Sequence, residues 1–195
     1  MANLIIKPTS GGSLILQDEG GDAAVTVGTT GSTTLAGTAN NLGTVTAGSI
    51  AGGTITSGTT FPSGHIIQVV QGSATASLEL TSASFVTTGL SAAITPTATS
   101  SKILVTYHIC YDSDANGTAA HYALYAGGSS IIDKVHYIHG ASSRVISTSS
   151  MMYLHSPNTT SATTYELMAK KMSGTRVYTR YGGTMSTMTL MEIKG

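Results

Sequence analysis

Acidic and amide side chains alternate in one short stretch and suggest a metal-binding loop. Asp112, Asp114, Asn116 and Gly117 spell D-x-D-x-N-G, the first half of a calcium-loop signature, in which oxygen ligands converge on a hard cation. The bidentate carboxylate of the second half is missing, because Ala123 stands at its position. Asn-Gly also supplies the two positive φ angles of a type I′ hairpin turn. The turn is the favoured interpretation, and calcium bound by Asp112, Asp114 and Asn116 is the alternative.

Histidine and cysteine side chains are the next candidates for chemistry. His136 and His139 are three residues apart on an expected strand, which directs them to opposite faces and argues against a metal shared within one chain. His108 and Cys110 face the same way inside the apolar run KILVTYHIC. A packed histidine and a buried thiol are favoured there, and a Cys/His metal pair is the alternative.

No catalytic constellation is evident in the sequence. Glycoside hydrolysis needs two carboxylates a few ångströms apart, and the one close pair beyond residue 78 is Asp112 and Asp114 in the expected turn. The motif G-x-S-x-G, the phosphate-binding P-loop and the dinucleotide fingerprint do not occur. We therefore expect a protein that is not an enzyme, with no catalytic residues and no cofactor-binding residues.

The composition is unusual for a soluble enzyme. Of 195 residues only 9% are charged, 23 are glycine, and the formal net charge is zero, whereas an average soluble protein has about 25% charged residues. A neutral chain has no general attraction to nucleic acid or to an anionic membrane, so neither is an expected partner. The start MANLIIKPTSGG has too short an apolar run for a secretory signal. We expect synthesis in a cytoplasm.

From residue 62 onward the pattern is that of consecutive β-strands. Turn signals such as TPTATSS, DSDANG, AGG and SGT separate runs of alternating apolar and polar residues. YELMAKKM fits a helix about as well as a strand, and we interpret it as a strand. The expected strands are residues 65–71, 84–94, 102–111, 119–126, 130–139, 143–155, 163–172, 175–182 and 186–194. This pattern predicts an all-β, antiparallel, jelly-roll-like β-sandwich.

The chain before residue 62 divides into two parts. Residues 1–22 contain two short β-like runs, NLIIK and SLILQ, and are expected to form a hairpin. Residues 23–61 contain no Asp, Glu, Lys or Arg. We place the start of a head domain, residues 62–195, at the Pro-Ser-Gly turn that follows.

A five-residue rhythm runs from Gly43 to Pro62, as GTVTA, GSIAG, GTITS and GTTFP. In a straight strand this spacing sends Val45 and Ile55 to one face and Ile50 to the other. A kink at each glycine points all three toward one axis, as in a β-helical coil. Four pentads are too few to bury a core alone. The rhythm therefore predicts a stalk in which three chains share these side chains, and a flexible Gly/Thr linker is the alternative.

Several stretches resemble fibre-like and surface virion proteins of aquatic tailed bacteriophages. They are NLIIKPTSGGSLILQDEGGDAAVTV, FPSGHIIQVVQ, TGLSAAITPTATSSKILVTY, LHSPNTTSATTYELMAKK and STMTLMEIKG. Such proteins are typically homotrimers that dock on the virion by an N-terminal portion and project a β-rich C-terminal domain. The resemblance implies virion docking by residues 1–22, a trimeric stalk at 23–61 and a surface-exposed head at 62–195. It implies a short tail or head fibre, or a capsid decoration or cement protein, whose partners are its own copies and other virion proteins.

A carbohydrate-binding module is the alternative function class. In that case the β-sandwich binds a host-surface glycan, with tyrosine rings as stacking surfaces and calcium held through Asp112 and Asp114. The basic residues Lys170, Lys171, Arg176 and Arg180 are expected around one hairpin, as a solvated edge or as a patch that touches acidic capsid surface or glycan. The methionines from residue 151 onward are expected to fill the core.

Overall fold

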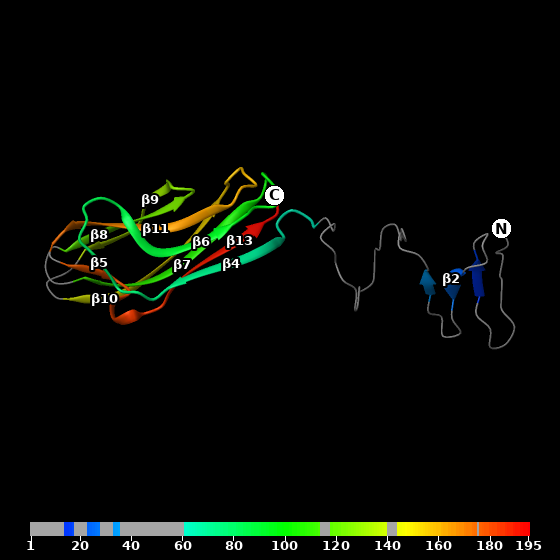
Figure 1. Cartoon of the computed structure of the whole chain (residues 1–195), viewed down its shortest axis with the longest axis horizontal. Helices are drawn as coiled ribbons and strands as arrows, with labels where there is room; N and C mark the ends of the chain where they lie inside the picture. Colours follow the sequence, from blue (N-terminus) through cyan, green and yellow to red (C-terminus); the bar gives the residue numbers. More distant parts are fainter. Residues whose placement is uncertain are drawn as a thin grey trace. The chain divides into compact units, whose positions relative to one another are not determined.

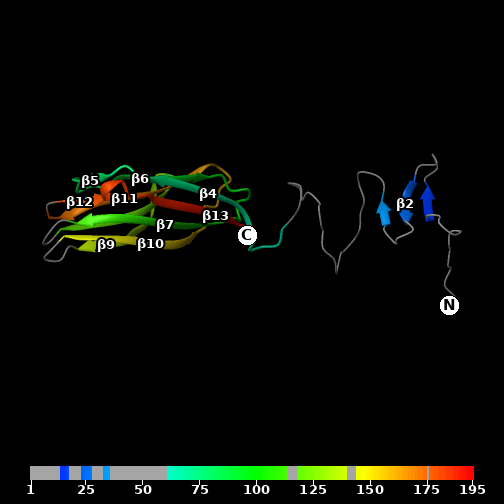
Figure 2. The same cartoon turned by 90° about the horizontal axis from the view of Figure 1, so that it is seen from below.

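The structure is a computed structural model of the chain that describes residues 14–17, 23–27, 33–35, 61–113, 118–139, 144–174 and 176–195 (Figures 1 and 2). It divides into two compact units, Met1–Thr56 and Ser57–Gly195. Val45, Ile50 and Ile55 lie outside the described residues, as do Asp114 and Asn116. The shared stalk and the calcium loop therefore stay predictions.

The N-terminal unit contains a three-stranded antiparallel sheet in the order β1-β2-β3. Its strands are β1 (Leu14–Gln17), β2 (Ala23–Val27) and β3 (Thr33–Leu35). β1 corresponds to the predicted run SLILQ, whereas the run NLIIK lies outside the described residues. The partner of β1 belongs to the segment assigned to the stalk, so the antiparallel pairing crosses the expected boundary at residue 22.

The C-terminal unit consists of two antiparallel sheets, and its larger sheet is built around β7. β13 and then β4 lie beside the first part of β7, β12 and then β5 beside its last part, and β10 pairs with its other edge. The strands are β4 (Ile66–Ala74), β5 (Leu78–Leu80), β7 (Lys102–Ser113), β10 (Val145–His155), β12 (Val177–Thr179) and β13 (Ser186–Ile193).

The smaller sheet has four strands in the order β6-β11-β8-β9. They are β6 (Val86–Ile94), β8 (Ala119–Ala126), β9 (Ser129–His139) and β11 (Thr163–Ser173). One core joins the two sheets, with Val105 and Leu190 from the larger sheet and Leu90, Leu124 and Leu167 from the smaller, all buried. The prediction of an all-β, antiparallel fold is confirmed, and YELMAKKM is indeed a strand.

The strand predictions were accurate where alternation was strong, and they failed at two places. Residues 175–182 were expected to form one strand, but β12 ends at Thr179 and a short 3-10 turn, η1 (Tyr181–Gly183), follows. The strand stops because Arg180 has a left-handed backbone, with φ of 54°, which no β-strand accommodates. The three-residue strand β5 was not predicted, because it is too short to show alternation.

The two sheets approach each other closely where β4 passes β6. A Cβ on Gly72 would overlap the carbonyl oxygen of Ser91, so only glycine fits there. The same region is tied by the buried carboxylate of Glu192, which accepts hydrogen bonds from Gln68 Nε2 at 2.6 Å, Thr97 N at 2.7 Å and Ser101 Oγ at 2.6 Å. These bonds join β13 to β4 and to the β6–β7 connection.

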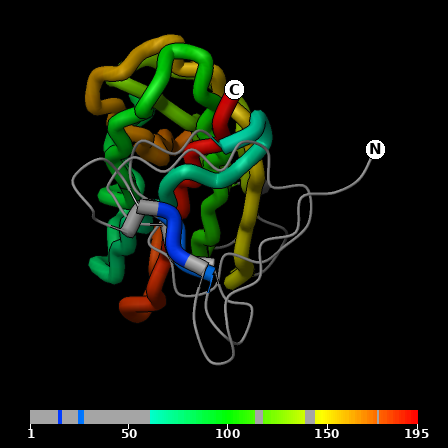
Figure 3. Tube along the Cα trace, turned by 90° about the vertical axis from the view of Figure 1, so that its right-hand side faces the viewer, coloured from blue at the N-terminus to red at the C-terminus, as the bar shows by residue number. Residues whose placement is uncertain are grey.

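The C-terminus returns to the end of the unit at which β4 begins (Figures 1 and 3). Gly64 donates to the carbonyl of Lys194, and Lys194 donates to that of His65, both at 2.8 Å. The chain therefore enters and ends this unit at one end of the sheets, which we call the entry end. Among the described residues, no helix is long and apolar enough to cross a bilayer.

Candidate functional site

The outer face of the larger sheet carries three rows of side chains that cross four strands. In the first row, Leu154 of β10 pairs with Leu104 of β7, which pairs with Met191 of β13, which pairs with Val69 of β4. The second row is Met152, Thr106, Thr189 and Gln71, and the third is Ser150, His108, Thr187 and Ser73. We call these twelve residues the uncharged face, since none of them carries a formal charge.

Strand alternation explains why these side chains point outward. Their neighbours Val105, Tyr107, Met188 and Leu190 point inward and are buried in the core, so residues one position away lie on the opposite side of the sheet. Large apolar groups are consequently left in solvent: Met152 is 68% exposed, Val69 56% and Leu154 46%. Ile66, at the start of β4, lies just beyond the first row and is 57% exposed.

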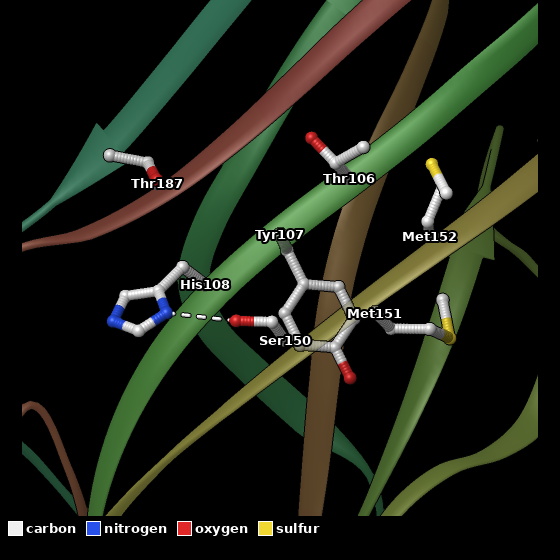
Figure 4. Close-up of a pocket in the computed structure, with 7 residues that line it drawn as sticks. All are labelled: Thr106, Tyr107, His108, Ser150, Met151, Met152 and Thr187. Atoms are coloured by element: carbon white, nitrogen blue, oxygen red, sulfur yellow. Dashed lines mark hydrogen bonds between the residues drawn. The ribbon is translucent and has the colours of Figure 1, made fainter.

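A shallow depression of about 440 Å³ lies on the uncharged face (Figure 4). It is lined by Thr106, Tyr107, His108, Ser150, Met151, Met152 and Thr187. In Figure 4 the His108 ring meets the Ser150 hydroxyl, and the distance from Nδ1 to Oγ is 2.9 Å. A serine–histidine pair needs a group to orient the histidine before the serine can act as a nucleophile, and no lining residue carries a carboxylate. The depression offers hydroxyl, imidazole and thioether groups for contact.

The other half of the same outer face, toward β12 and β5, has a different character. Tyr178 of β12 donates its hydroxyl to Glu79 Oε2 at 2.9 Å, and its ring lies 5.6 Å from that of Tyr181. The Arg144 guanidinium lies over the Tyr181 ring at 4.4 Å, and that of Arg176 over Tyr178 at 5.0 Å. We call Arg144, Arg176, Tyr178 and Tyr181 the aromatic–arginine cluster. Both arginines make cation–π contacts, which stabilise the two rings.

Asp112, the first predicted calcium ligand, is already engaged by a side chain. It is buried on β7, and Arg144 donates to both of its carboxylate oxygens. In the described part of the chain no three His, Cys, Asp or Glu side chains come close enough to share a metal ion.

The histidines and the cysteine occupy different environments. Cys110 is a buried free thiol, as expected. His108 is exposed rather than packed, because its position on β7 points to the outer face. His136 lies against the rings of Tyr111 and Tyr122, and burial lowers the pKa of its imidazole. The side chain of His139 is not among the described side chains.

Two further predictions about side chains were wrong. Arg180 is only 2% exposed and is not part of a solvated basic edge. Its Nε donates to the carbonyl of Ala76 at 2.7 Å and its Nη2 donates to that of Thr88. The methionines are not uniformly core filler, since Met188 is buried but Met172 and Met185 are 51% and 63% exposed. Sequence alternation assigns faces but does not show what covers each face, so neither result was accessible without the fold.

Comparison with known proteins found no family model that matches the chain and no curated protein similar to it.

Proposed function

We propose that the chain is a non-enzymatic structural protein of a bacteriophage virion. In this proposal it is a homotrimer, anchored to the particle by residues 1–22 and raised on an intertwined stalk at 23–61. Its jelly-roll-like head, residues 62–195, is exposed at the particle surface as a short tail or head fibre or as a capsid decoration protein. Its partners are its own copies and other phage virion proteins.

The uncharged face is the observation that carries this proposal. A monomeric soluble protein rarely exposes a contiguous apolar patch without using it for binding. Here the exposed side chains of Val69, Met152 and Leu154 lie on one face, next to the end at which the chain enters the unit. A protein with few charged residues and an uncharged sheet face is suited to assembly with other protein subunits. The resemblance to virion proteins indicates that this assembly is a virion.

Localisation on the particle tests the proposal. Virions of the virus that encodes the chain are purified, and its copy number is measured by quantitative mass spectrometry against the major capsid protein. Immunogold labelling of residues 62–195 then shows where it lies. A copy number near a multiple of the capsid symmetry indicates a decoration protein, and a few copies at one vertex indicate a tail fibre. Absence of the chain from purified particles overturns the proposal.

A host-glycan-binding head is the second candidate, and the aromatic–arginine cluster is the observation that favours it. Tyr181 is 39% exposed and lies beside Tyr178, and exposed aromatic rings are suitable stacking surfaces for sugars. The test is a glycan array with wild-type protein and with Tyr181→Ala. Tyr137→Ala on β9 is the matched control, because Tyr137 is also exposed, at 54%, but belongs to the other sheet. Binding that survives Tyr181→Ala, or no glycan binding at all, removes this candidate.

A further inference from the structure

We propose that the uncharged face of the head is the surface through which copies of this chain meet around the axis of the trimer. The inference rests on the homotrimeric assembly proposed above and adds the surface of contact. The occupant is the uncharged face of a neighbouring copy.

The charge distribution distinguishes this face from the outer face of the smaller sheet. On β11, Glu166 and Lys170 point outward, since the alternating Tyr165, Leu167 and Ala169 are buried. The three rows on the larger sheet contain no charged residue across four strands. Charged residues are depleted at the centres of protein interfaces, and methionine is enriched there. Of the two outer faces, that of the larger sheet has the composition of an interface.

The position of the face along the chain favours another copy over a different protein. The predicted stalk pentads end at Pro62, and β4 begins four residues later at Ile66, which an extended chain spans in about 13 Å. Three chains that share an axis through the stalk must therefore begin their heads close to it. Ile66 and Val69 are the first outward residues of β4, and they lead directly into the first row.

The polar groups of the face are compatible with self-association. Thr106, Thr187 and Ser150 carry hydroxyls that both donate and accept hydrogen bonds. Gln71 donates to Thr189 Oγ1 at 3.0 Å and retains its carbonyl oxygen for another donor. Charges of one sign placed near a threefold axis would repel one another. The twelve residues of the face carry none, and the exposed Lys102, two positions before Leu104 on β7, lies at the border of the face in the same row as Ile66. A contact between neighbours around a threefold axis is heterologous, so groups with both hydrogen-bonding roles can find partners on a different part of the neighbouring face.

Cysteine crosslinking in the full chain tests the surface. Thr189→Cys places a thiol at the centre of the face and Met168→Cys places one on the outer face of the smaller sheet, each in a Cys110→Ala background. Oligomeric state is measured first by sedimentation, and a short bismaleimide crosslinker is then added. We expect both proteins to be trimers. Crosslinked chains are expected for Thr189→Cys and not for Met168→Cys.

Two outcomes overturn the inference, and they can be told apart. A trimer in which Thr189→Cys reacts with monofunctional maleimide but forms no crosslink overturns the surface and leaves the trimer intact. A folded wild-type monomer overturns the surface and the homotrimer together. Thr189→Glu and Met168→Glu, with Cys110 in place, give a second readout. Only the former is expected to lower the thermal midpoint of the trimer in a concentration-dependent way, and equal shifts for both contradict the inference.

Discussion

The carboxylate of Asp112 receives two hydrogen bonds from the guanidinium of Arg144, from Nε at 2.9 Å and from Nη2 at 2.8 Å. This fork is a strong arrangement for an arginine–carboxylate pair. The side chain of Asp112 is 2% exposed and that of Arg144 42%. A buried charge thus depends on a partner that reaches solvent, and Asp112 has a structural use that needs no metal ion.

We expect Arg144→Met to lower the urea midpoint of unfolding, because it leaves the Asp112 carboxylate buried without its cation. Adding Asp112→Asn to that variant should recover part of the loss, since the unpaired charge is then gone. Lys102→Met is the control, because it removes an exposed cation from β7, the strand that carries Asp112. Equal midpoints for Arg144→Met and Lys102→Met would show that the pair contributes nothing.

Calcium provides a separate prediction. A calcium ion at Asp112 must displace Arg144 from both carboxylate oxygens, so we expect the thermal midpoint of the wild-type protein to be the same with calcium and with a chelator. A ligand that binds the folded state raises its stability by mass action. A midpoint that rises with calcium concentration would therefore contradict this expectation and support the calcium-loop alternative.

The fold class was predictable because the strands of the C-terminal unit alternate strongly. Residues 186–194 place Met188 and Leu190 on one side and Thr187 and Thr189 on the other, and this side-to-side pattern is visible in the sequence. The failure at Arg180 has a different origin. Its burial depends on carbonyl groups of Ala76 and Thr88, which are distant in the sequence, and a basic residue at the end of a strand is ordinarily exposed.

The candidate surface was not predictable, because it depends on register. Met191, Leu104 and Leu154 form one row only when β13 and β10 both pair with β7 in the observed alignment. A shift of one residue in either pairing would turn that strand's outward side chains into the core. Alternation alone leaves these long-range alignments undetermined, so the sequence indicated the strands but not the surface they create.

Glu192→Gln is expected to destabilise the protein by about 2 kcal/mol, the scale for losing hydrogen bonds to a buried charged acceptor. Glu192 is fully buried and accepts from Gln68, Thr97 and Ser101. The amide NH₂ of a glutamine cannot accept from these donors. Glu166→Gln on β11 is the control for a less buried carboxylate. Chemical denaturation at neutral pH measures both.

The stability of the Glu192→Gln variant should depend on pH differently from that of the wild type. Burial alone raises the pKa of the Glu192 carboxyl, but hydrogen bonds from Ser101, Gln68 and Thr97 outweigh it, so the net shift is downward from 4.5. The carboxylate therefore contributes stability that is present above 4.5 and is lost as pH falls through the lower folded-state pKa. We expect the difference between wild type and Glu192→Gln to shrink in acid. If the difference in stability between the two proteins does not change with pH, ionisation of the Glu192 carboxyl is not the cause of the destabilisation.

Two half-buried histidines predict a loss of stability at mildly acidic pH. Burial lowers the pKa of His136 and of His155 from 6.5, so between that value and the folded-state pKa the unfolded chain binds more protons. Stability then rises with pH through this window and falls as pH drops below 6.5. His155→Gln keeps a group able to bond the Tyr165 hydroxyl, which lies 2.8 Å from Nδ1. We expect this variant to have a shallower fall in thermal midpoint between about pH 7 and pH 5, and an unchanged slope would contradict the assignment.

Arg180 combines a buried guanidinium with a left-handed backbone, and the two features can be separated by substitution. Its side chain connects the carbonyls of Ala76 and Thr88, and its backbone N–H donates to the carbonyl of Cys110 at 2.8 Å. Arg180→Ala leaves both acceptors without this donor, so we expect a loss of about 3 kcal/mol. It keeps the strained φ that the wild type also has. Arg180→Gly loses the same hydrogen bonds but accepts positive φ without strain.

Arg180→Gly should therefore be more stable than Arg180→Ala by about 1 kcal/mol, the cost of the left-handed conformation for a residue with a Cβ. This order reverses the usual preference, because glycine elsewhere in a strand is less stable than alanine. Arg180→Lys should lie between wild type and Arg180→Ala, since an ammonium group cannot reproduce the planar fork of the guanidinium. Urea midpoints of the three variants test both features. If Arg180→Gly and Arg180→Ala have equal urea midpoints, the left-handed backbone contributes nothing to the difference in stability. If lysine matches arginine, a single positive charge is enough to join the β4–β5 connection to β6.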